Sequence, residues 1–171
     1  MQERDRSRSS SLASRRDVLL AGWLTRTLEL YPSTSRDFLT REKDPFRNPA
    51  GNTLRQGLAG LLDGLLGARG LPNLVSQLEP IVRLLAVQDI APSRALSFLL
   101  PIKDLVRQEA LCLGERAIQE AQLLDAEVDQ LVLAGFDLYM KFREEICQIE
   151  VNAAKRSLYV LLSRQNRGGC G

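Results

Sequence analysis

Apolar residues recur every three or four positions along most of the chain, and the strict alternation typical of a β-strand is scarce. Prolines and glycines interrupt this spacing and mark where helices begin and end. We expect helices over residues 14–31, 53–68, 73–88, 92–113 and 117–165, and at most one short helix around 36–41. Pro80 shapes or kinks the third of these helices, and Pro101 kinks the fourth. The pattern therefore predicts an all-α fold of about five to six helices, either globin-like or bundle-like.

The last predicted helix is the longest and the most informative. It contains no proline and a single glycine, Gly135. At about 100° per residue, one side of it holds Leu124, Val128, Leu131, Val132, Gly135, Leu138, Tyr139, Phe142, Ile146 and Ile149. Leu133, Phe136 and Met140 widen that side. We therefore expect this helix to pack against several neighbours.

The final turns of this helix have a different pattern, because residues 158–162 are apolar in every direction around the axis. A helix that lies on one core cannot bury all of them, and exposed apolar patches of this kind mark interaction sites. We expect an output surface here, used for a homodimer or a protein partner. The candidate interface residues are Leu158, Tyr159, Leu161 and Leu162. The alternative is that the helix bends back and that Leu158 and Leu162 complete the core.

The chain has 171 residues, which suits one domain with tails. Residues 1–12 are basic and rich in serine, without the apolar stretch of a secretory signal, and we expect a disordered tail. Residues 13–165 form the expected helical domain, and residues 166–171 form a flexible tail that contains glycine and cysteine. No apolar run approaches the roughly 20 residues that a transmembrane helix needs. We expect a cytoplasmic protein without a membrane span.

The composition disfavours most catalytic chemistry. Histidine is absent, which removes Ser-His-Asp and Cys-His catalysis, histidine-ligated haem and histidine zinc sites. The formal net charge of +2 is too small for binding of nucleic acid driven by overall charge. The three cysteines, Cys112, Cys147 and Cys170, are far apart and form no Cys-x-x-Cys pair. We therefore expect no enzyme, no catalytic residues, no cofactor and no metal.

One thiol remains a candidate for chemistry. Cys170 lies in the glycine-rich sequence RGGCG, where it could exchange electrons as a reactive thiol on a mobile arm. The alternative is an inert thiol, because no base that would lower its pKa lies near it in the sequence.

Five glycines, at positions 57, 60, 64, 67 and 70, recur at intervals of three or four residues in LRQGLAGLLDGLLGARG. The sequence lacks the Gly-Lys followed by Ser or Thr that a phosphate loop requires. Each glycine inside a helix costs roughly 0.5–1 kcal/mol of helix stability relative to alanine. We therefore expect the stripe to make an interaction that offsets this cost. It is either a face where another helix packs closely or a groove for a ligand.

Charged residues occur on the apolar side of the long helix. Arg143 and Glu150 lie two turns apart there, and buried charges need partners, for which Asp89 and Arg83 are candidates. Together with Gln88 they form a candidate polar network. This network is either structural or a sensory site, since charges with perturbed pKa values gather at functional sites.

Three stretches of the sequence contain distinctive strings. The first has Trp23, Tyr31-Pro32 and Phe38, then DPFRNP at 44–49 and Gly51. The second has IVR at 81–83, AVQDIAPS at 86–93, Ala95, Phe98 and Lys103. The third has AGFD at 134–137, Tyr139, Arg143, Ile146, Val151-Asn152 and Lys155-Arg156. Together they resemble the N-terminal module of RsbRD-type proteins, the RsbT co-antagonist paralogues of bacterial stress signalling.

The resemblance implies a helical sensory or regulatory module that precedes an effector through a C-terminal signalling helix. Because the sequence contains no effector, we expect a non-enzymatic protein-interaction module that acts in trans. Its small-molecule ligand, if it binds one, is not identified by the sequence. The alternative function is that of a redox accessory protein that uses Cys170.

Overall fold

The computed structural model describes residues 11–42, 44–88 and 90–168, with the backbone alone described for residues 34 and 160–168. Over these residues the chain forms helices and no strand, so the predicted all-α fold is confirmed. In order, the elements are the 3₁₀ helix η1 (Ser11–Arg15), α1 (Arg16–Leu28), α2 (Ser33–Arg41), α3 (Pro49–Leu66), α4 (Leu71–Ala86), α5 (Pro92–Leu96), the 3₁₀ helix η2 (Ser97–Leu99), α6 (Pro101–Leu113) and α7 (Glu115–Gly168).

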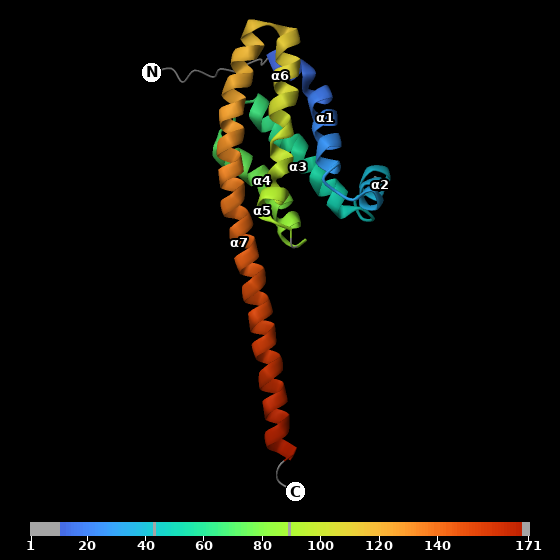
Figure 1. Ribbon diagram of the computed structural model, residues 1–171, viewed down its shortest axis with the longest axis vertical. Coiled ribbons are helices and arrows are strands. Elements are labelled where there is room, and N and C mark those ends of the chain that lie inside the picture. The colour runs from blue at the N-terminus through green and yellow to red at the C-terminus, as the bar shows by residue number, and fades with distance from the viewer. Residues whose placement is uncertain (1–10, 43, 89, 169–171) are drawn as a thin grey trace, which may run out of the picture.

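The helices form a body from which one long helix projects (Figure 1). α6 and α7 form an antiparallel pair joined at Gly114, whose φ of 97° lies in the left-handed region that suits glycine. α4 and α5 pack on the first half of α7, α3 packs on α4, and α1 packs on α3 and α6. The second half of α7 extends beyond all these helices (Figure 1).

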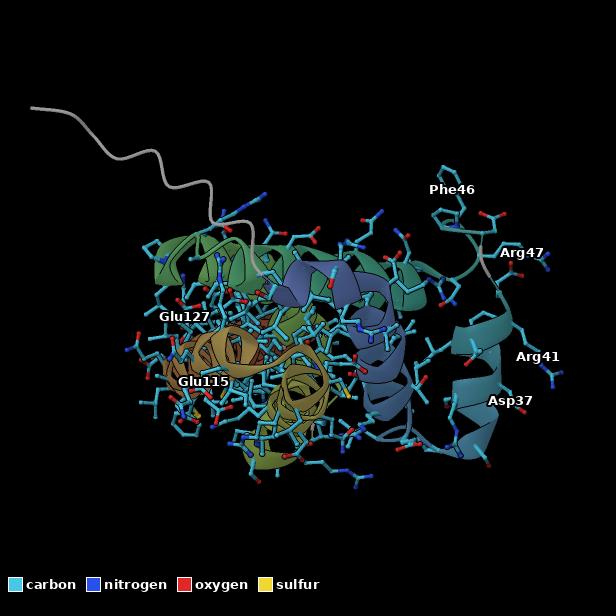
Figure 2. All side chains as sticks on the ribbon, turned by 90° about the horizontal axis from the view of Figure 1, so that it is seen from above. Asp37, Arg41, Phe46, Arg47, Glu115 and Glu127 are labelled. Carbon is cyan, nitrogen blue, oxygen red and sulfur yellow. The ribbon has the colours of Figure 1, made fainter. Side chains whose placement is uncertain are left out.

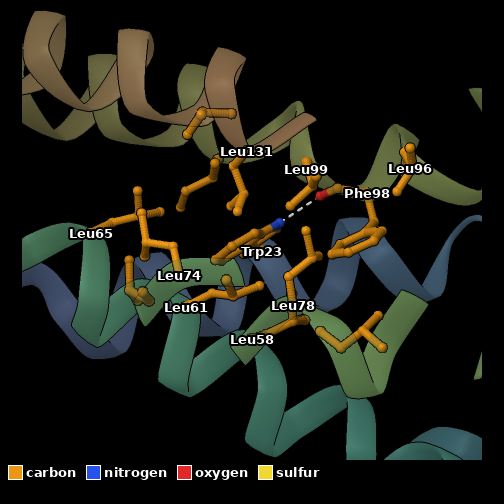
Figure 3. Packing of buried hydrophobic residues seen from close by; sticks show 14 of the residues in the cluster. Trp23, Leu58, Leu61, Leu65, Leu74, Leu78, Leu96, Phe98, Leu99 and Leu131 are labelled. Carbon is orange, nitrogen blue, oxygen red and sulfur yellow. Dashed lines mark hydrogen bonds between the residues drawn. The ribbon is translucent and has the colours of Figure 1, made fainter. Parts of the chain in front are cut away.

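Trp23 on α1 is at the centre of the core. Its side chain is fully buried, and its indole Nε1–H donates a hydrogen bond of 2.6 Å to the carbonyl oxygen of Phe98. Leucines of α3, α4 and α7 surround it (Figure 3). This bond ties α1 to η2, and it satisfies the one polar atom of a side chain that otherwise contributes only apolar surface.

The glycine stripe of α3 is a packing face, as one of the two interpretations predicted. A Cβ built on Gly57 would lie 2.6 Å from Cδ1 of Ile81, and one built on Gly64 would lie 2.7 Å from Cδ2 of Leu74. A Cβ on Gly60 would collide with the Gln77 side chain. The glycines therefore let α3 and α4 approach more closely than alanine would allow.

Two predictions about local structure are wrong. The helix expected over 92–113 is broken into α5, η2 and α6 rather than kinked, because Pro101 lacks an N–H and begins a new helix instead of continuing the old one. The expected N-terminal tail extends too far, because Leu12 is buried and the Ser11 and Leu12 N–H groups donate to the Glu120 carboxylate at 3.2 and 3.3 Å. Residues 1–10 lie outside the described residues.

The segment between α2 and α3 is built around a buried asparagine. Asn48 caps α3 by accepting a 2.8 Å hydrogen bond from the Gly51 N–H, and its amide donates to the carbonyl oxygens of Leu39 and Glu42. Phe46, two residues earlier, is 95% exposed. Figure 2 shows Phe46 on the α2 side of the molecule, away from Glu115 and Glu127.

Candidate functional site

The turn between α4 and α5 is held against α7 by two side chains of α7. The Tyr139 hydroxyl donates a hydrogen bond to the carbonyl oxygen of Ile90, and Nη1 of Arg143 donates to the carbonyl oxygen of Ala86 at 3.1 Å. Tyr139 and Arg143 are four residues apart and so share one face of α7. Arg143 binds the start of the turn, at Ala86, and Tyr139 binds its end, at Ile90. We call this pair of hydrogen bonds the α7 clasp.

The clasp has a clear electrostatic cause at Ala86. This residue is the last of α4, so its carbonyl oxygen has no partner further along the helix. A helix C-terminus carries partial negative charge, which a guanidinium stabilises. Arg143 therefore caps α4 from another helix, and this explains how an arginine is accommodated among the buried residues of α7.

Arg83 also contacts α7, by a different interaction. Its guanidinium carbon lies 4.3 Å from the centroid of the Phe142 ring, and its Nη2 forms an ion pair with Glu79 at 3.0 Å. The Arg83 side chain is more than half exposed, so both contacts lie at the surface. A cation over an aromatic face at such a site contributes about 0.5–1 kcal/mol.

The predicted polar network is thus assembled only in part. Arg83 and Arg143 lie where α4 meets α7, Gln88 lies on the turn that follows α4, and Asp89 lies outside the described residues. The prediction that Glu150 is buried with Arg143 is wrong, because Glu150 is exposed. The physical reason is that α7 has left the body at this point, so the side that is buried at Phe142 faces solvent at Glu150.

A cavity of about 260 Å³ lies beside the same turn. Its apolar lining consists of Leu30, Pro32, Leu54, Leu85, Ile90, Ala95 and Phe98. Its polar lining consists of Thr27 and Tyr31 on or just after α1, and of Gln88 and Arg94 on the turn and α5. Ile90 belongs to both features, since it lines the cavity and its carbonyl oxygen accepts the Tyr139 bond.

Tyr31 is the unusual residue of this cavity. Its hydroxyl oxygen is buried and has no hydrogen-bond partner among the described residues. Burial raises the pKa of Tyr31, and the nearby Gln88 side chain opposes this shift in part although no hydrogen bond of normal geometry joins them. The hydroxyl is therefore protonated at neutral pH and can donate a hydrogen bond to a molecule in the cavity.

α7 also has a second apolar face, which the other helices leave uncovered. Leu133, Phe136 and Met140 are 70%, 46% and 48% exposed, so the prediction that they widen the buried side is wrong. At about 100° per residue, they share an arc of about 60° with exposed residues further along. We call this set the outer stripe, and its members are Leu133, Phe136, Met140, Cys147, Val151, Ala154 and Leu158.

The candidate interface residues lie on the projecting part of α7. Leu158 and Tyr159 are 58% and 73% exposed, and Ile149, which was expected on the buried side, is 65% exposed. The helix does not bend back, since α7 continues unbroken to Gly168. For Leu161 and Leu162 the structure describes only the helical backbone.

Sequence reasoning missed the cavity and the partner of Tyr139. The sequence places Tyr139 on the apolar side of its helix. Its spacing of four residues from Arg143 was the one sign that the two side chains could bind the same segment. The Tyr31 hydroxyl gave no such signal, because the residues that surround it come from elements far apart in the sequence.

The thiols and acids suggest no metal centre in the described part of the chain. Within it, no group of three or more cysteine, aspartate or glutamate side chains is arranged to hold a metal ion. Cys112 and Cys147 are free and exposed, and Cys170 lies outside the described residues. None of the described helices has a stretch long and apolar enough to cross a membrane.

The fold defines a class: an all-helical domain with a long C-terminal helix. The family model for the RsbT co-antagonist protein rsbRD N-terminal domain matches residues 17–152, which is most of the chain, and the protein belongs to this family. It is therefore a regulatory domain of stress signalling. The chain has no significant match among curated proteins or among solved structures.

Proposed function

We propose that this protein is a non-enzymatic sensory module whose output is α7, and that two copies pair through the outer stripe. The observation that carries the proposal is the uncovered apolar face of α7, which begins on the body at Leu133 and continues along the projecting half to Leu158. Each large side chain buried in such a pair contributes about 1.5–3 kcal/mol.

The spacing of the stripe supports a coiled-coil pair, and we propose that the two helices run parallel. Leu133, Met140, Cys147 and Ala154 recur every seven residues, which is the repeat of a left-handed coiled coil. In a parallel pair without a shift in register, each of these residues meets its own copy across the symmetry axis. Both projecting ends then lie side by side, with Leu158 in the seam and Tyr159 at its edge.

In this proposal the α7 clasp connects sensing to output. Tyr139 and Arg143 fix α7 against the turn between α4 and α5, and they lie between Leu133 and Cys147 of the outer stripe. A change in the turn therefore acts on the same helical segment that pairs. The paired end of α7 is the surface that a partner protein contacts in trans.

The exposed free thiols of Cys112 and Cys147 support a cytoplasmic location, where such thiols stay reduced. The redox alternative depends on Cys170, and it stays a prediction.

The test uses Cys147 as a reporter of pairing. In a variant with Cys112→Ser and Cys170→Ser, mild oxidation is expected to link two chains through Cys147, because a disulfide forms only when the two Cβ atoms come within about 4 Å. Light scattering after size exclusion is expected to give the mass of a dimer.

Met140→Lys places a charge in the stripe and is expected to yield a folded monomer that does not cross-link. Leu123→Lys is the matched control, because Leu123 is also an exposed leucine of α7 but lies outside the outer stripe. A wild-type chain that stays monomeric at 100 micromolar without forming the Cys147 link would sink the proposal.

A further inference from the structure

The cavity beside the turn between α4 and α5 has the chemistry of a ligand site. Its volume of about 260 Å³ lies just below the range of about 300–1,000 Å³ that is usual for pockets of drug-sized ligands. A ligand that fills it is therefore small. Seven apolar residues line it, so most of that ligand is hydrocarbon.

Three polar side chains of the cavity, those of Tyr31, Gln88 and Arg94, offer hydrogen-bond donors, whereas the Thr27 hydroxyl already donates to the carbonyl oxygen of Trp23. The Tyr31 hydroxyl is buried without a partner, and Gln88 offers amide N–H groups close to it. Arg94 lines the same cavity, and its guanidinium forms no ion pair or hydrogen bond with the described residues. Aspartate and glutamate are absent from the described residues of the lining.

We propose that this cavity binds a small monocarboxylate with a short hydrocarbon tail. The tail lies among Leu54, Leu85 and Phe98, and the carboxylate accepts hydrogen bonds from Tyr31, Gln88 and Arg94. A guanidinium and a carboxylate match in geometry, and hydrogen bonds between charged groups are the strong ones. Arg94 is exposed at the edge of the cavity, so its guanidinium is placed to meet the polar end of such a ligand, and inorganic phosphate would leave the apolar wall unused.

The position of the site gives the ligand access to α7. Gln88 and Ile90 lie on the turn held by the α7 clasp, so a ligand that binds them acts on the segment gripped by Tyr139 and Arg143. This regulatory consequence rests on the proposed function, whereas binding does not depend on pairing. A ligand shifts a conformational balance only through unequal affinity for the two states.

The experiment measures binding of sodium hexanoate to the full chain by calorimetry and by saturation-transfer NMR, with hexan-1-ol as the neutral analogue. Wild-type protein is expected to bind one hexanoate saturably and to bind hexan-1-ol about tenfold more weakly. Arg94→Gln is expected to weaken hexanoate about tenfold and to leave hexan-1-ol unchanged. Tyr31→Phe, which removes only the hydroxyl, is expected to weaken hexanoate about fivefold.

Two further variants separate the possible failures. Arg69→Gln removes the same charge at the turn between α3 and α4, away from the lining, and is expected to leave hexanoate binding unchanged. Met140→Lys is expected to bind hexanoate as the wild type does, so a failure of α7 pairing does not hide the site. Absence of saturable hexanoate binding, or equal binding by wild type and Arg94→Gln, overturns the proposal.

Discussion

The two halves of α7 have similar sequence patterns and different surroundings. The half on the body has a buried face, with Val128, Leu131 and Tyr139, and an uncovered face, with Leu133 and Met140. On the projecting half every residue from 147 to 159 is exposed, although Ile149, Val151 and Leu158 continue the apolar pattern. Helical periodicity therefore shows that a face is apolar, and the position of the other helices decides whether the chain itself covers that face.

The largest expected difference lies between two leucines of the first half that are two residues apart. Leu131→Lys places a charge at a position with no exposed surface and is expected to lower the free energy of unfolding by about 4 kcal/mol. Leu133→Lys, at a position 70% exposed, is expected to change it by less than about 0.5 kcal/mol in the monomer. Urea titration at low protein concentration measures both. Equal losses would mean that the two faces are equally buried.

Enlarging a small residue is expected to have opposite effects in the body and on the projection. Gly64→Leu overpacks the contact with Leu74 and is expected to lower the free energy of unfolding by about 1–3 kcal/mol. Ala154→Leu adds apolar surface to the outer stripe and is expected to tighten dimerisation without destabilising the monomer. Thermal melts of Gly64→Leu and sedimentation of Ala154→Leu are the measurements. A weaker Ala154→Leu dimer would contradict the register proposed for the pair.

A smaller effect is expected from removing one hydroxyl at the clasp. Tyr139→Phe leaves the carbonyl oxygen of Ile90 without its partner and is expected to cost about 1–2 kcal/mol. Tyr159→Phe makes the same change on the projection, where the side chain is 73% exposed, and is expected to cost nothing measurable. Hydrogen exchange of the amides at 87–91 should rise in Tyr139→Phe alone. Unchanged exchange of these amides would mean that the Tyr139 hydrogen bond does not hold the turn.

The smallest effect concerns acid sensitivity of the body. Arg16 holds Asp63 by two hydrogen bonds, of 2.5 and 2.9 Å, and these bonds hold the pKa of Asp63 below its usual value. A lowered pKa stabilises the folded state above the unfolded value of about 3.8, and this stability is lost as the pH falls through the folded value. Because both side chains are more than a third exposed, less than about 1 kcal/mol is expected.

The check is the free energy of unfolding between pH 6 and pH 2 for wild type and Asp63→Asn. The variant is expected to lose less stability on acidification than the wild type does. An identical slope in both proteins would mean that the Arg16 pair does not persist in solution.

Sequence reasoning predicted the helices well where a glycine marks a boundary, as at Gly70, which precedes α4, and Gly114, which separates α6 from α7. Of its two interpretations of the α3 glycines, close packing against a helix or a groove for a ligand, the structure shows the first. It failed at Pro101, where a break and a kink have the same sequence signal. It failed for Leu133, Phe136 and Met140, because helical periodicity does not separate two adjacent apolar faces of one helix.

The candidate site was predictable only in fragments. Arg83 and Arg143 contact α4 and α7 at neighbouring points, whereas Gln88 lies on the turn and lines the cavity instead. The partners themselves are mostly backbone carbonyl oxygens, which every residue has and which a sequence therefore cannot single out. The cavity depends on how α1, α3 and α5 meet, and that is a property of their packing.

The length of α7 beyond the α7 clasp amplifies any tilt of the helix at the clasp. From Arg143 to Gly168 the helix is uninterrupted, and at about 1.5 Å per residue this arm is roughly 37 Å long. A tilt of about 5° at the α7 clasp therefore displaces the far end of the helix by about 3 Å, which is close to the rise of two helical residues. A rearrangement of the turn too small to disturb the core is thus large enough, at the tip, to change which side chains face a neighbouring molecule.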